Sequence, residues 1–533
     1  MRNSTDTGNK IIDYARLAII GLLAIFLLLE LALSLSWRMQ HDTPILHYIA
    51  FLIDKHNFIP YKDVFETSMP GAFLLHLAIG HWFGYSDLAF RIVDVAYLSL
   101  LLSITWFIMR PFGKTVASAS ILLFGLLYLS YGPKMSLQRD CVGILPIAMA
   151  LFLVSNDFIL INKANLRAFV TGALFGLSAA IKPHLSIGLP ALIIYMALNV
   201  RPEKKKGAES FLRHLLKCGL FTVSGFILIL SLPLLWLWNK GGIPYFWEMF
   251  SRYLPLYLHL TGMHQTISGV EWWIHLIKAY LKLGGMYTFL IPIVLGIYMV
   301  FSKLAKNSVE IKLVFLLITL LFLYSIYPVF AGQFWKYHWM PFAYFASLFV
   351  SFLLLPTPSV SCKLYKCILP LIVFAIFLLI AIHPAPEFVR QVSGQSPAPP
   401  KEGRVDEIAD FLKTHLGPTD KVQPLDWVDG GAVHGMLIAQ AVVATPYIQD
   451  FYFYHDISEP YIQEIRRRFI KCLKEEYPKY IIDIDVAVAE RPTGKDTTTE
   501  FPELKKYISE NYIAVYKCNG FKILGRKQGL TVP

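Results

Sequence analysis

The sequence predicts a polytopic α-helical membrane protein with about eleven transmembrane helices and a C-terminal α/β domain outside the membrane. Three observations lead to this fold class. The 533 residues are 55% hydrophobic and only 16% charged, whereas soluble domains are nearer a quarter charged. Apolar runs long enough to cross a bilayer recur from residue 15 to residue 383. After residue 383 the composition becomes polar and rich in turn-forming residues.

The apolar runs set the number of predicted crossings. Nine have spanning length, and two shorter ones flank Lys182-Pro183-His184, where a proline and charges at membrane depth require contact with protein or water. We interpret the two short runs as helices that meet at the outer side. The eleven segments are about 15–36, 91–109, 115–131, 140–161, 168–181, 184–200, 218–238, 281–301, 312–330, 338–356 and 366–383.

The distribution of Lys and Arg gives the predicted orientation. With the N-terminus inside, the inner connections carry 18 Lys and Arg over 65 residues, and the outer connections before the last helix carry 10 over 115. Cytoplasmic loops are enriched in these residues. An odd number of spans then places residues 384–533 outside. The predicted location is the plasma membrane, or bacterial inner membrane, with an extracytoplasmic C-terminal domain.

The first outer loop, residues 37–90, is long and half apolar. Its segments 43–53 and 72–84 are too short to span, so we expect helices lying at the interface. A second outer segment, 239–280, is rich in Trp and Tyr, which is typical of a membrane interface. The predicted domains are 1–383 for the transmembrane part with this loop, 384–402 for a Pro-rich linker, and 403–533 for the α/β domain.

The α/β prediction depends on alternating helical and strand patterns after the linker. A Gly-rich turn at 429–431 and a basic helix stand among them. We expect helices at 403–415, 458–476 and 501–511, and strands at 421–427, 441–445, 479–484, 512–518 and 521–525.

Charge and cysteine content exclude several classes of protein. The net charge of +12 fits cytoplasmic loops better than nucleic-acid binding, so no nucleic-acid partner is expected. The six cysteines contain no C-x-x-C pair, which argues against a structural zinc site. Cys472 and Cys518 could pair in an oxidising compartment, or both could stay free.

Four polar clusters fall on the predicted outer side. Carboxylates suit a base that takes a proton from a hydroxyl, and Arg and Lys suit the phosphate of a lipid-linked donor. The alternative is that each group only reaches to the interface or forms a structural pair. The clusters are Asp42 with Asp63 and Glu66; Gln138-Arg139-Asp140; Lys182-Pro183-His184; and Gln333-Phe334-Trp335-Lys336-Tyr337-His338.

Several short motifs resemble a known family. Asp42 and Tyr48, the run P-Y-K-D-V-F-E-T-S-M-P-G, and Gly84 followed by Arg91 resemble the N-terminal region of GT-C-fold glycosyltransferases. The similarity is to bacterial membrane enzymes of the protein O-mannosyltransferase and aminoarabinose transferase type. Q-R-D at the fourth span and K-Y-H-W-M-P-F at the tenth also resemble outer-loop signatures of that family.

The resemblance implies roles for individual residues. It implies that Asp42 is the catalytic carboxylate and that Asp63 is a second loop acid, which orients the acceptor or holds a possible divalent metal ion. Met69-Pro70-Gly71 replaces the usual Pro-Pro pair, and Thr43 stands where many members have Glu, so the sugar and any metal dependence stay open. The predicted substrate-binding residues are Lys62, Glu66, Arg139, Asp140, Lys182, His184, Lys336, Tyr337 and His338, and no metal ligand is assigned.

The resulting hypothesis is an inverting glycosyltransferase at the outer membrane face. It would move a sugar from a polyprenyl-phosphate donor to a lipid, glycan or protein acceptor, with a loop Asp as base and membrane lipids as further partners. One alternative is a flippase or transporter of lipid-linked sugars. Transporters often have two similarly broken helices, and this sequence has one such break, at Lys182-Pro183. A second alternative is a non-catalytic glycan-binding membrane protein.

Overall fold

The computed structural model describes residues 2–156, 163–199, 208–304, 309–356, 365–427, 429–485 and 492–527. Parts of the predicted inner connections lie outside these residues. The chain forms two compact units, each built from three stretches. We call residues 1–37, 92–232 and 278–396 the membrane unit, and residues 38–91, 233–277 and 397–533 the polar unit. Helices α4, α10 and α13 continue from one unit into the other.

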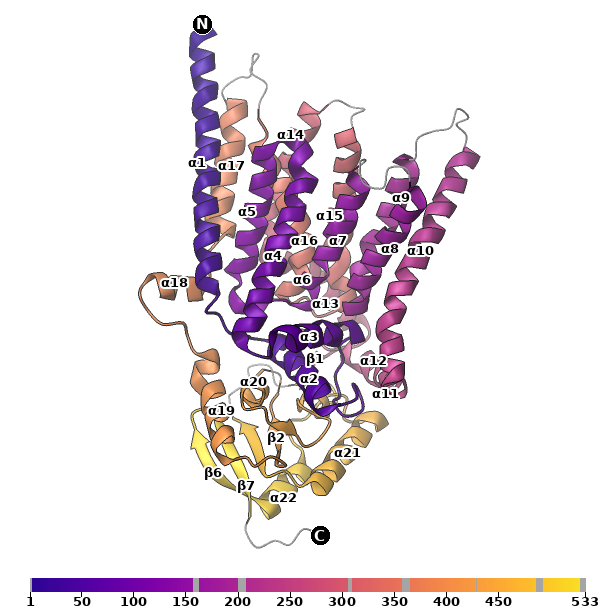
Figure 1. The fold of residues 1–533 in the computed structure, drawn as a ribbon, viewed down its shortest axis with the longest axis vertical. Helices are drawn as coiled ribbons and strands as arrows, with labels where there is room; N and C mark the ends of the chain where they lie inside the picture. The colour runs from indigo at the N-terminus through magenta and orange to yellow at the C-terminus, as the bar shows by residue number, and fades with distance from the viewer. Residues whose placement is uncertain are drawn as a thin grey trace. The chain divides into compact units, whose positions relative to one another are not determined.

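Each of the eleven predicted spans contains helix (Figure 1). Seven helices in the described part of the chain are long and apolar enough to cross a membrane. An eighth is added if α17 and α18, which meet at 88°, count as one bent span. The predicted multi-pass helical fold is confirmed, and the number of eleven crossings stays a prediction. The helices are α1 (Arg2–Ser34), α4 (Asp87–Met109), α5 (Lys114–Ser130), α6 (Arg139–Val142), α7 (Ile144–Ser155), α8 (Ala164–Ile181), α9 (Leu189–Asn199), α10 (Ala208–Asn239), α14 (Leu290–Lys303), α15 (Val309–Ala331), α16 (Met340–Ser351), α17 (Tyr365–Ala381) and α18 (Pro386–Val392).

Short 3₁₀ helices connect these elements and contain several of the polar clusters. They are η1 (Arg110–Phe112), η2 (Gly132–Met135), η3 (Pro183–Gly188), η5 (Leu283–Phe289), η6 (Lys336–Trp339) and η7 (Phe352–Leu354).

Helix α16 is the centre of the membrane unit. All of its residues are buried, and it packs against α5, α14 and α15. A helix that is apolar all round is stable only when other helices cover it. Small residues permit close packing: a Cβ at Gly296 of α14 would lie 2.1 Å from the Phe349 carbonyl oxygen of α16. This rigid centre holds η6 and its polar residues, which lead directly into α16.

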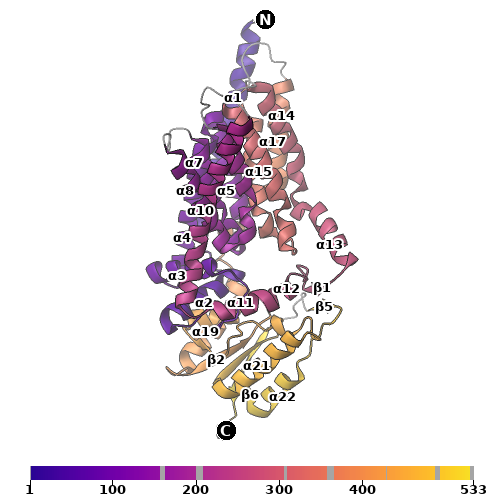
Figure 2. The same cartoon turned by 90° about the vertical axis from the view of Figure 1, so that its right-hand side faces the viewer.

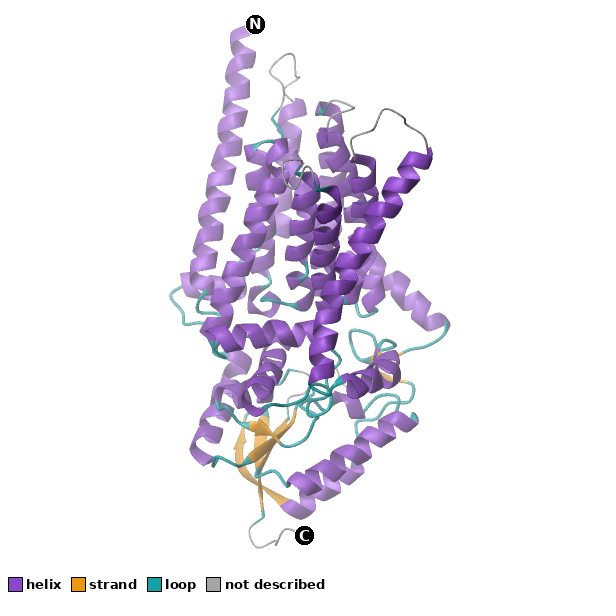
Figure 3. Cartoon of the chain, turned by 45° about the vertical axis from the view of Figure 1, so that its right-hand side comes forward, coloured by secondary structure: helices purple, strands orange, loops and turns teal. Residues whose placement is uncertain are grey.

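The polar unit contains the predicted α/β region (Figure 3). Its five-stranded sheet has the order β3-β2-β4-β7-β6, with β2 parallel to β3 and β4, and β7 antiparallel to β4 and β6. The register pairs Val422 with Tyr480, and Ile482 with Ile523. The elements are η8 (Pro400–Gly403), α19 (Arg404–His415), β2 (Lys421–Leu425), α20 (Ala432–Ile438), β3 (Val442–Val443), η9 (Phe451–Phe453), α21 (Pro460–Glu476), β4 (Tyr480–Ile484), α22 (Pro502–Asn511), β6 (Tyr512–Cys518) and β7 (Phe521–Arg526).

The amphipathic pattern of α21 explains its position. Tyr461, Ile462, Ile465, Phe469 and Leu473 recur at helical spacing and are all buried. Pro460 occupies the first helical position, where its missing N–H has no intrahelical partner to lose. The helix therefore presents an apolar face to the polar unit's core and a charged face outward.

The first outer loop forms part of the polar unit. It folds into α2 (Asp42–His56) and α3 (Pro70–Phe83), which pack on each other, and α2 also packs on α20. The Tyr48 hydroxyl donates to the Ala441 carbonyl at 2.8 Å, and the Phe65 N–H donates to the Pro446 carbonyl at 2.8 Å. The second outer segment adds α11 (Ile243–Glu248), the π-helix η4 (Met249–Tyr253), α12 (Leu254–Tyr257), β1 (Gln265–Thr266) and α13 (Val270–Leu281), and β1 pairs with β5 (Thr493–Gly494), as Figure 2 labels them.

Candidate functional site

A buried ion pair is the centre of the membrane unit's polar cluster. Asp140, in α6, is fully buried, and the Lys182 Nζ donates to both of its carboxylate oxygens at 2.9 Å. The Tyr327 hydroxyl of α15 donates to Oδ1 at 2.6 Å. Burying a charge is favourable only when partners satisfy it. Lys182 and Tyr327 therefore hold Asp140 as a fully bonded carboxylate.

Aromatic rings and histidines surround this ion pair. The Lys182 Nζ lies 5.8 Å from the ring centre of Tyr327 and 5.9 Å from that of Tyr337. The His184 ring centre is 6.0 Å from Tyr327. His338 is buried, stacks on Trp335 and interacts electrostatically with Asp140 and Lys182. The cluster thus brings together three predicted segments that are far apart in the sequence.

Arg139 and Lys336 occupy the less buried part of this cluster. Arg139 is half-buried and interacts electrostatically with His338 and Tyr327. Lys336 is exposed, and its Nζ lies 5.9 Å from the ring centre of Tyr131. Of the predicted donor-binding residues, Arg139, Asp140, Lys182, His184, Tyr337 and His338 therefore share one cluster, and Lys336 lies in η6 beside it.

A second buried acid positions the Q-R-D segment. Leu137, just before it, has a φ of 47°, which is strained for a branched side chain. Its N–H donates to the Asp94 carboxylate at 3.1 Å and to the Tyr128 hydroxyl at 3.0 Å. The Tyr128 hydroxyl also donates to Asp94 at 2.5 Å. Sequence reasoning missed Asp94, Tyr128 and Tyr327; a polar group at the end of an apolar run was the only available signal.

Asp42 lies in the polar unit, at the first turn of α2. Its carboxylate pairs with the His41 Nδ1 at 2.9 Å, and its side chain is 14% exposed. The N-terminal end of a helix stabilises a negative charge. Burial alone would lower the pKa of His41, but the charge of Asp42 and the hydrogen bond to it raise that pKa above its ordinary value. Asp429 adds to this rise, and Lys401 opposes it.

The other predicted loop residues lie in the turn between α2 and α3. The Asp63 Oδ2 accepts the Ile59 N–H at 2.8 Å, and Lys62 is exposed. Glu66 is buried, and its Oε1 accepts hydrogen bonds from the Thr67 N–H, the Thr67 hydroxyl and the Ser68 hydroxyl at 2.9–3.2 Å. Such a pattern is typical of a structural carboxylate. Asp42, Asp63 and Glu66 thus have separate partners within the polar unit.

The sequence analysis did not predict a role for two acidic residues that follow β2. Asp429 pairs with the Lys401 Nζ at 2.6 Å, after the carboxyl end of β2. Asp426, also after β2, accepts the N–H groups of Gly430 and Ala432 at 2.6 and 3.0 Å. Burial, and to a smaller extent the charge of Asp429, raises the pKa of Asp426 to about 6 against the opposing Gly430 hydrogen bond. The Gly-rich turn was the sequence signal for this region.

The described residues contain no group of three His, Cys, Asp or Glu side chains arranged to hold a metal ion. Cys472 and Cys518, whose pairing the sequence left open, both have free thiols.

Comparisons with known proteins identify the fold. No family model matches the chain, and no curated protein matches it in sequence. Among solved structures, the chain is similar to ArnT from Cupriavidus metallidurans bound to undecaprenyl phosphate. The TM-score is 0.56 at 10% identity, over 97% of this chain and 99% of that chain. The apo state of the same protein gives 0.56 at 12% identity, over 97% and 100%. The Archaeoglobus fulgidus oligosaccharyltransferase in the apo form gives 0.49 at 11% identity, over 97% and 75%.

The ArnT likeness extends over nearly the whole of both chains. At these identities it shows the fold alone, and the chain therefore has the GT-C fold that its sequence motifs predicted.

Proposed function

We propose that the chain is an inverting glycosyltransferase that takes a sugar from a polyprenyl-phosphate donor and transfers it to an acceptor hydroxyl at the outer membrane face. The observation that carries the proposal is the buried cluster of Asp140, Lys182 and Tyr327, in a chain with the fold of a structure bound to undecaprenyl phosphate. Ionisable groups buried in a membrane protein are by default functional candidates.

The cations of the membrane unit suit the donor phosphate. Arg139 is half-buried and can donate two parallel hydrogen bonds to phosphate oxygens. Lys182 is oriented by Asp140 and Tyr327 through the contacts described above, so its charge is held in place before the donor binds. In this role Asp140 positions Lys182 and does not take a proton. His184, Tyr337 and His338 complete the lining, and Lys336 adds charge at the exposed edge.

Asp42 suits the role of base. Its carboxylate takes the proton from the acceptor hydroxyl as that oxygen attacks C1 of the donor sugar. The bond from C1 to the phosphate oxygen breaks on the opposite face, and polyprenyl phosphate leaves with the bonding electrons. The cations stabilise the charge that develops on the leaving phosphate. The configuration at C1 is inverted because a single displacement occurs.

The remaining loop residues take supporting roles in this proposal. Asp63 orients the acceptor through the turn that its Ile59 hydrogen bond closes. Glu66 holds the backbone of that turn, and Lys62 contacts the acceptor from its exposed position. No step requires a metal ion.

The proposed orientation places the N-terminus inside and the polar unit outside. Single cysteines at Lys114, in a predicted inner connection, and at Lys505, on α22, test it in a chain without native cysteines. A membrane-impermeant thiol reagent added to intact cells should label position 505 and spare position 114. The reverse pattern would contradict the orientation.

A transfer assay tests the proposed activity. Purified protein in liposomes, given a radiolabelled polyprenyl-phosphate sugar and a membrane glycolipid extract, should release unlabelled polyprenyl phosphate and yield a labelled acceptor. Movement of intact donor across the bilayer without transfer would instead identify a flippase. Glycan binding with neither result would identify a non-catalytic receptor.

A further inference from the structure

The polar unit has a small pocket whose walls come from all three of its chain stretches. Its volume is about 230 Å³, and it is lined by Tyr61, Lys62, Phe65, Tyr245, Glu248, Pro446, Tyr447, Tyr461, Arg468, Lys471, Cys472 and Glu475. Sites for drug-sized ligands are usually about 300–1,000 Å³, so this pocket suits a single ring. Five of its residues are aromatic, and a network of charged groups forms its rim.

The aromatic walls are fixed by their own contacts. The Tyr61 hydroxyl donates to the Ser68 carbonyl at 2.6 Å, and the Tyr61 ring packs against Phe246 with ring centres 5.1 Å apart. Phe65 packs against Tyr447 at 5.6 Å. Rings that are held by such contacts offer preformed flat surfaces to a ligand, and tyrosine adds a hydroxyl at the ring edge.

The rim is held by ion pairs between α21 and the segment 239–280. The Arg468 guanidinium bonds Glu248 at 2.7 Å and also bonds Glu464. The Arg252 guanidinium reaches Glu464 at 2.9 Å and lies 4.3 Å from the Tyr461 ring centre. A bonded carboxylate still has free acceptor sites, so Glu248 can accept a hydroxyl hydrogen without losing Arg468.

Tyr447 contributes a hydroxyl to the pocket. Its side chain lines the pocket and is only 4% exposed. A tyrosine hydroxyl can both donate and accept a hydrogen bond. Arg468 and Glu248 are near enough to interact electrostatically with Tyr447. These surroundings suit a ligand that both donates and accepts hydrogen bonds beside a flat apolar face.

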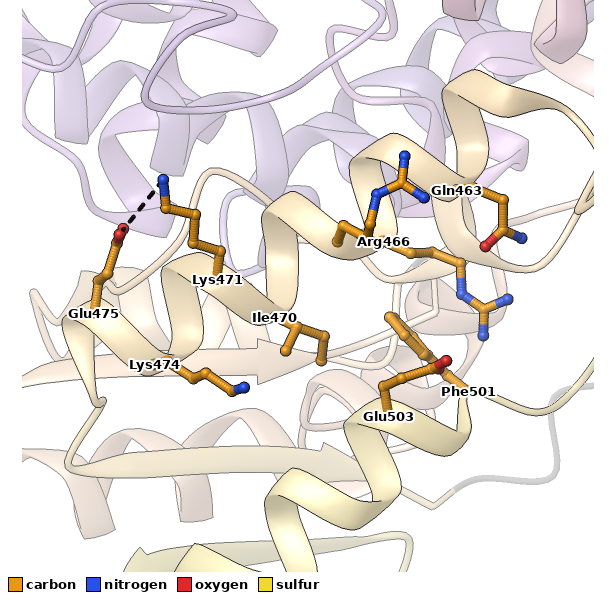
Figure 4. A pocket seen from close by; sticks show the side chains of 9 residues that line it. Gln463, Arg466, Ile470, Lys471, Lys474, Glu475, Phe501 and Glu503 are labelled. Atoms are coloured by element: carbon orange, nitrogen blue, oxygen red, sulfur yellow. Dashed lines mark ion pairs between the residues drawn. The ribbon is translucent and has the colours of Figure 1, made fainter. Parts of the chain in front are cut away.

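The lining of the pocket has one more cationic side chain than anionic side chains. Arg468 is paired with Glu248. Lys471 is paired with Glu475 at 3.7 Å, and a dashed line marks this pair in Figure 4. Lys62 is exposed and has no ion pair among the described residues. The net charge of the lining thus favours a ligand with a single acidic group.

We infer that this pocket binds one acidic sugar ring of a glycan acceptor, with the ring against the tyrosines, a ring hydroxyl on Tyr447 and the acidic group toward Lys62. A sugar ring matches each feature, since it has an apolar C–H face, an edge of hydroxyls and a size near that of the pocket. The inference rests on the proposed function, because it narrows the acceptor to a glycan that carries a carboxylate or a phosphate.

The thiol of Cys472 provides a direct readout, because it lines the pocket and is half-buried. The experiment uses the full chain in detergent at pH about 8.5, since burial raises the pKa of Cys472. Alkylation at Cys472 and Cys518 is followed by mass spectrometry. Cys518, on β6, is an internal reference. The probes are methyl glucuronide, methyl galacturonide, glucose 6-phosphate and galactose 6-phosphate, with methyl glucoside and methyl galactoside as neutral counterparts.

At least one acidic sugar should slow alkylation of Cys472 and leave Cys518 unchanged. Tyr447→Phe keeps the ring and removes the hydroxyl, so the half-protecting concentration should rise about 2- to 12-fold. Tyr516→Phe, on β6 outside the pocket, should leave the half-protecting concentration at Cys472 unchanged; because Tyr516 interacts with Cys518, each variant is compared with its own unprotected Cys472 rate. Lys62→Gln should remove the advantage of acidic over neutral sugars, about two- to fivefold at an exposed site. Lys474 lies on α21 and lines a neighbouring pocket, which Figure 4 shows. Lys474→Gln should therefore leave the advantage of acidic over neutral sugars unchanged.

Equal alkylation rates with and without every probe would overturn the inference, as would protection that Tyr447→Phe leaves unchanged while the variant keeps the wild-type melting temperature. The transfer assay separates the two proposals. Transfer without sugar protection would leave the proposed function standing and remove the acidic-sugar site. Protection that depends on Tyr447, in a protein that shows no transfer, would leave the acidic-sugar site standing and remove the proposed function.

Discussion

Asp140 and Asp42 are both acids that the sequence analysis placed on the predicted outer side, yet their surroundings differ. Asp140 is fully buried and is bonded to Lys182 and Tyr327. Asp42 is 14% exposed, lies at the start of a helix and pairs with a histidine. A general base must reach its substrate and accept a proton, whereas a carboxylate bonded to a buried lysine is stable only when ionised. The contrast favours Asp140 as a positioning residue and Asp42 as the base.

The largest expected effect is at Asp42. Asp42→Asn keeps the size of the side chain and removes the basic oxygen, so kcat should fall by about 10²–10⁴-fold. The control is Asp54→Asn, in the last turn of the same helix, where Asp54 pairs with Lys55 at 2.9 Å and His81 at 3.1 Å. It should leave turnover nearly unchanged. Near-normal turnover in Asp42→Asn, with loss in Asp63→Asn, would show that the two loop acids exchange roles.

The second effect concerns the stability of the Asp140 ion pair. Lys182→Met leaves a buried carboxylate without its cation and should lower the free energy of unfolding by about 3–5 kcal/mol. The double variant Lys182→Met with Asp140→Asn should recover most of the loss, since the amide oxygen still accepts from Tyr327. Lys421→Met is the matched control, because Lys421 and Glu476 pair on the surface, where a pair contributes about 0–1 kcal/mol. Thermal unfolding in detergent measures all three; equal losses at positions 182 and 421 would contradict the contrast between the two environments.

Local patterns predicted the elements of both regions well. The apolar runs predicted the helices of the membrane unit, and amphipathic periodicity predicted α19 (Arg404–His415) and α21 (Pro460–Glu476) to within two residues at each end. These features depend on residues close in sequence, where hydrophobic spacing alone is sufficient. The two short helices of the first outer loop followed from length, since neither predicted segment can span a bilayer, and their place at the membrane interface stays a prediction.

Partners distant in the sequence could not be predicted. Tyr327 meets Asp140 across 187 positions, and nothing in its apolar run distinguishes its hydroxyl from any other. Tyr447 is likewise one tyrosine among 28 until the fold places it in a pocket. The sequence analysis placed Glu66 in one polar cluster with Asp42 and predicted that it binds substrate, but it could not predict the three local hydrogen bonds that Glu66 accepts. Side-chain partners across a fold depend on tertiary packing, which a linear pattern does not contain.

A third effect compares Arg139 and Lys336, two of the membrane unit's cations that the proposal assigns to the donor phosphate. Arg139→Ala should weaken binding of undecaprenyl phosphate by about 1.5–3 kcal/mol, the usual range for a charge-assisted hydrogen bond. Lys336 is exposed, so Lys336→Ala should cost about 0.2–1 kcal/mol and lose its effect at high salt. Arg110→Ala, which removes a guanidinium 5.3 Å from the Trp106 ring centre, is the control. The measurement is equilibrium binding of undecaprenyl phosphate to the purified variants at two salt concentrations. A larger loss of affinity in Lys336→Ala than in Arg139→Ala would show that Lys336 is the main phosphate ligand.

The smallest effect concerns the pairing of Asp42 with His41. The pKa of His41 is raised in the folded chain, so protonated His41 stabilises the fold. This stabilisation is fully present below pH about 6.5, the unfolded pKa, and is lost as the pH rises through the higher folded pKa. The side chain is 28% exposed, so the pair should contribute less than about 1 kcal/mol.

His41→Asn removes the titrating group, and Asn tolerates the φ of 62° better than most residues. The difference in unfolding free energy between the wild type and His41→Asn should therefore shrink from pH 6 to pH 9. Lys401→Met removes the cation that opposes protonation of His41, so in that background the same decline should occur at higher pH. If this difference in unfolding free energy stays constant from pH 6 to pH 9, Asp42 does not bind protonated His41. The contrast between Asp42 and Asp140 would then depend only on how deeply each carboxylate is buried.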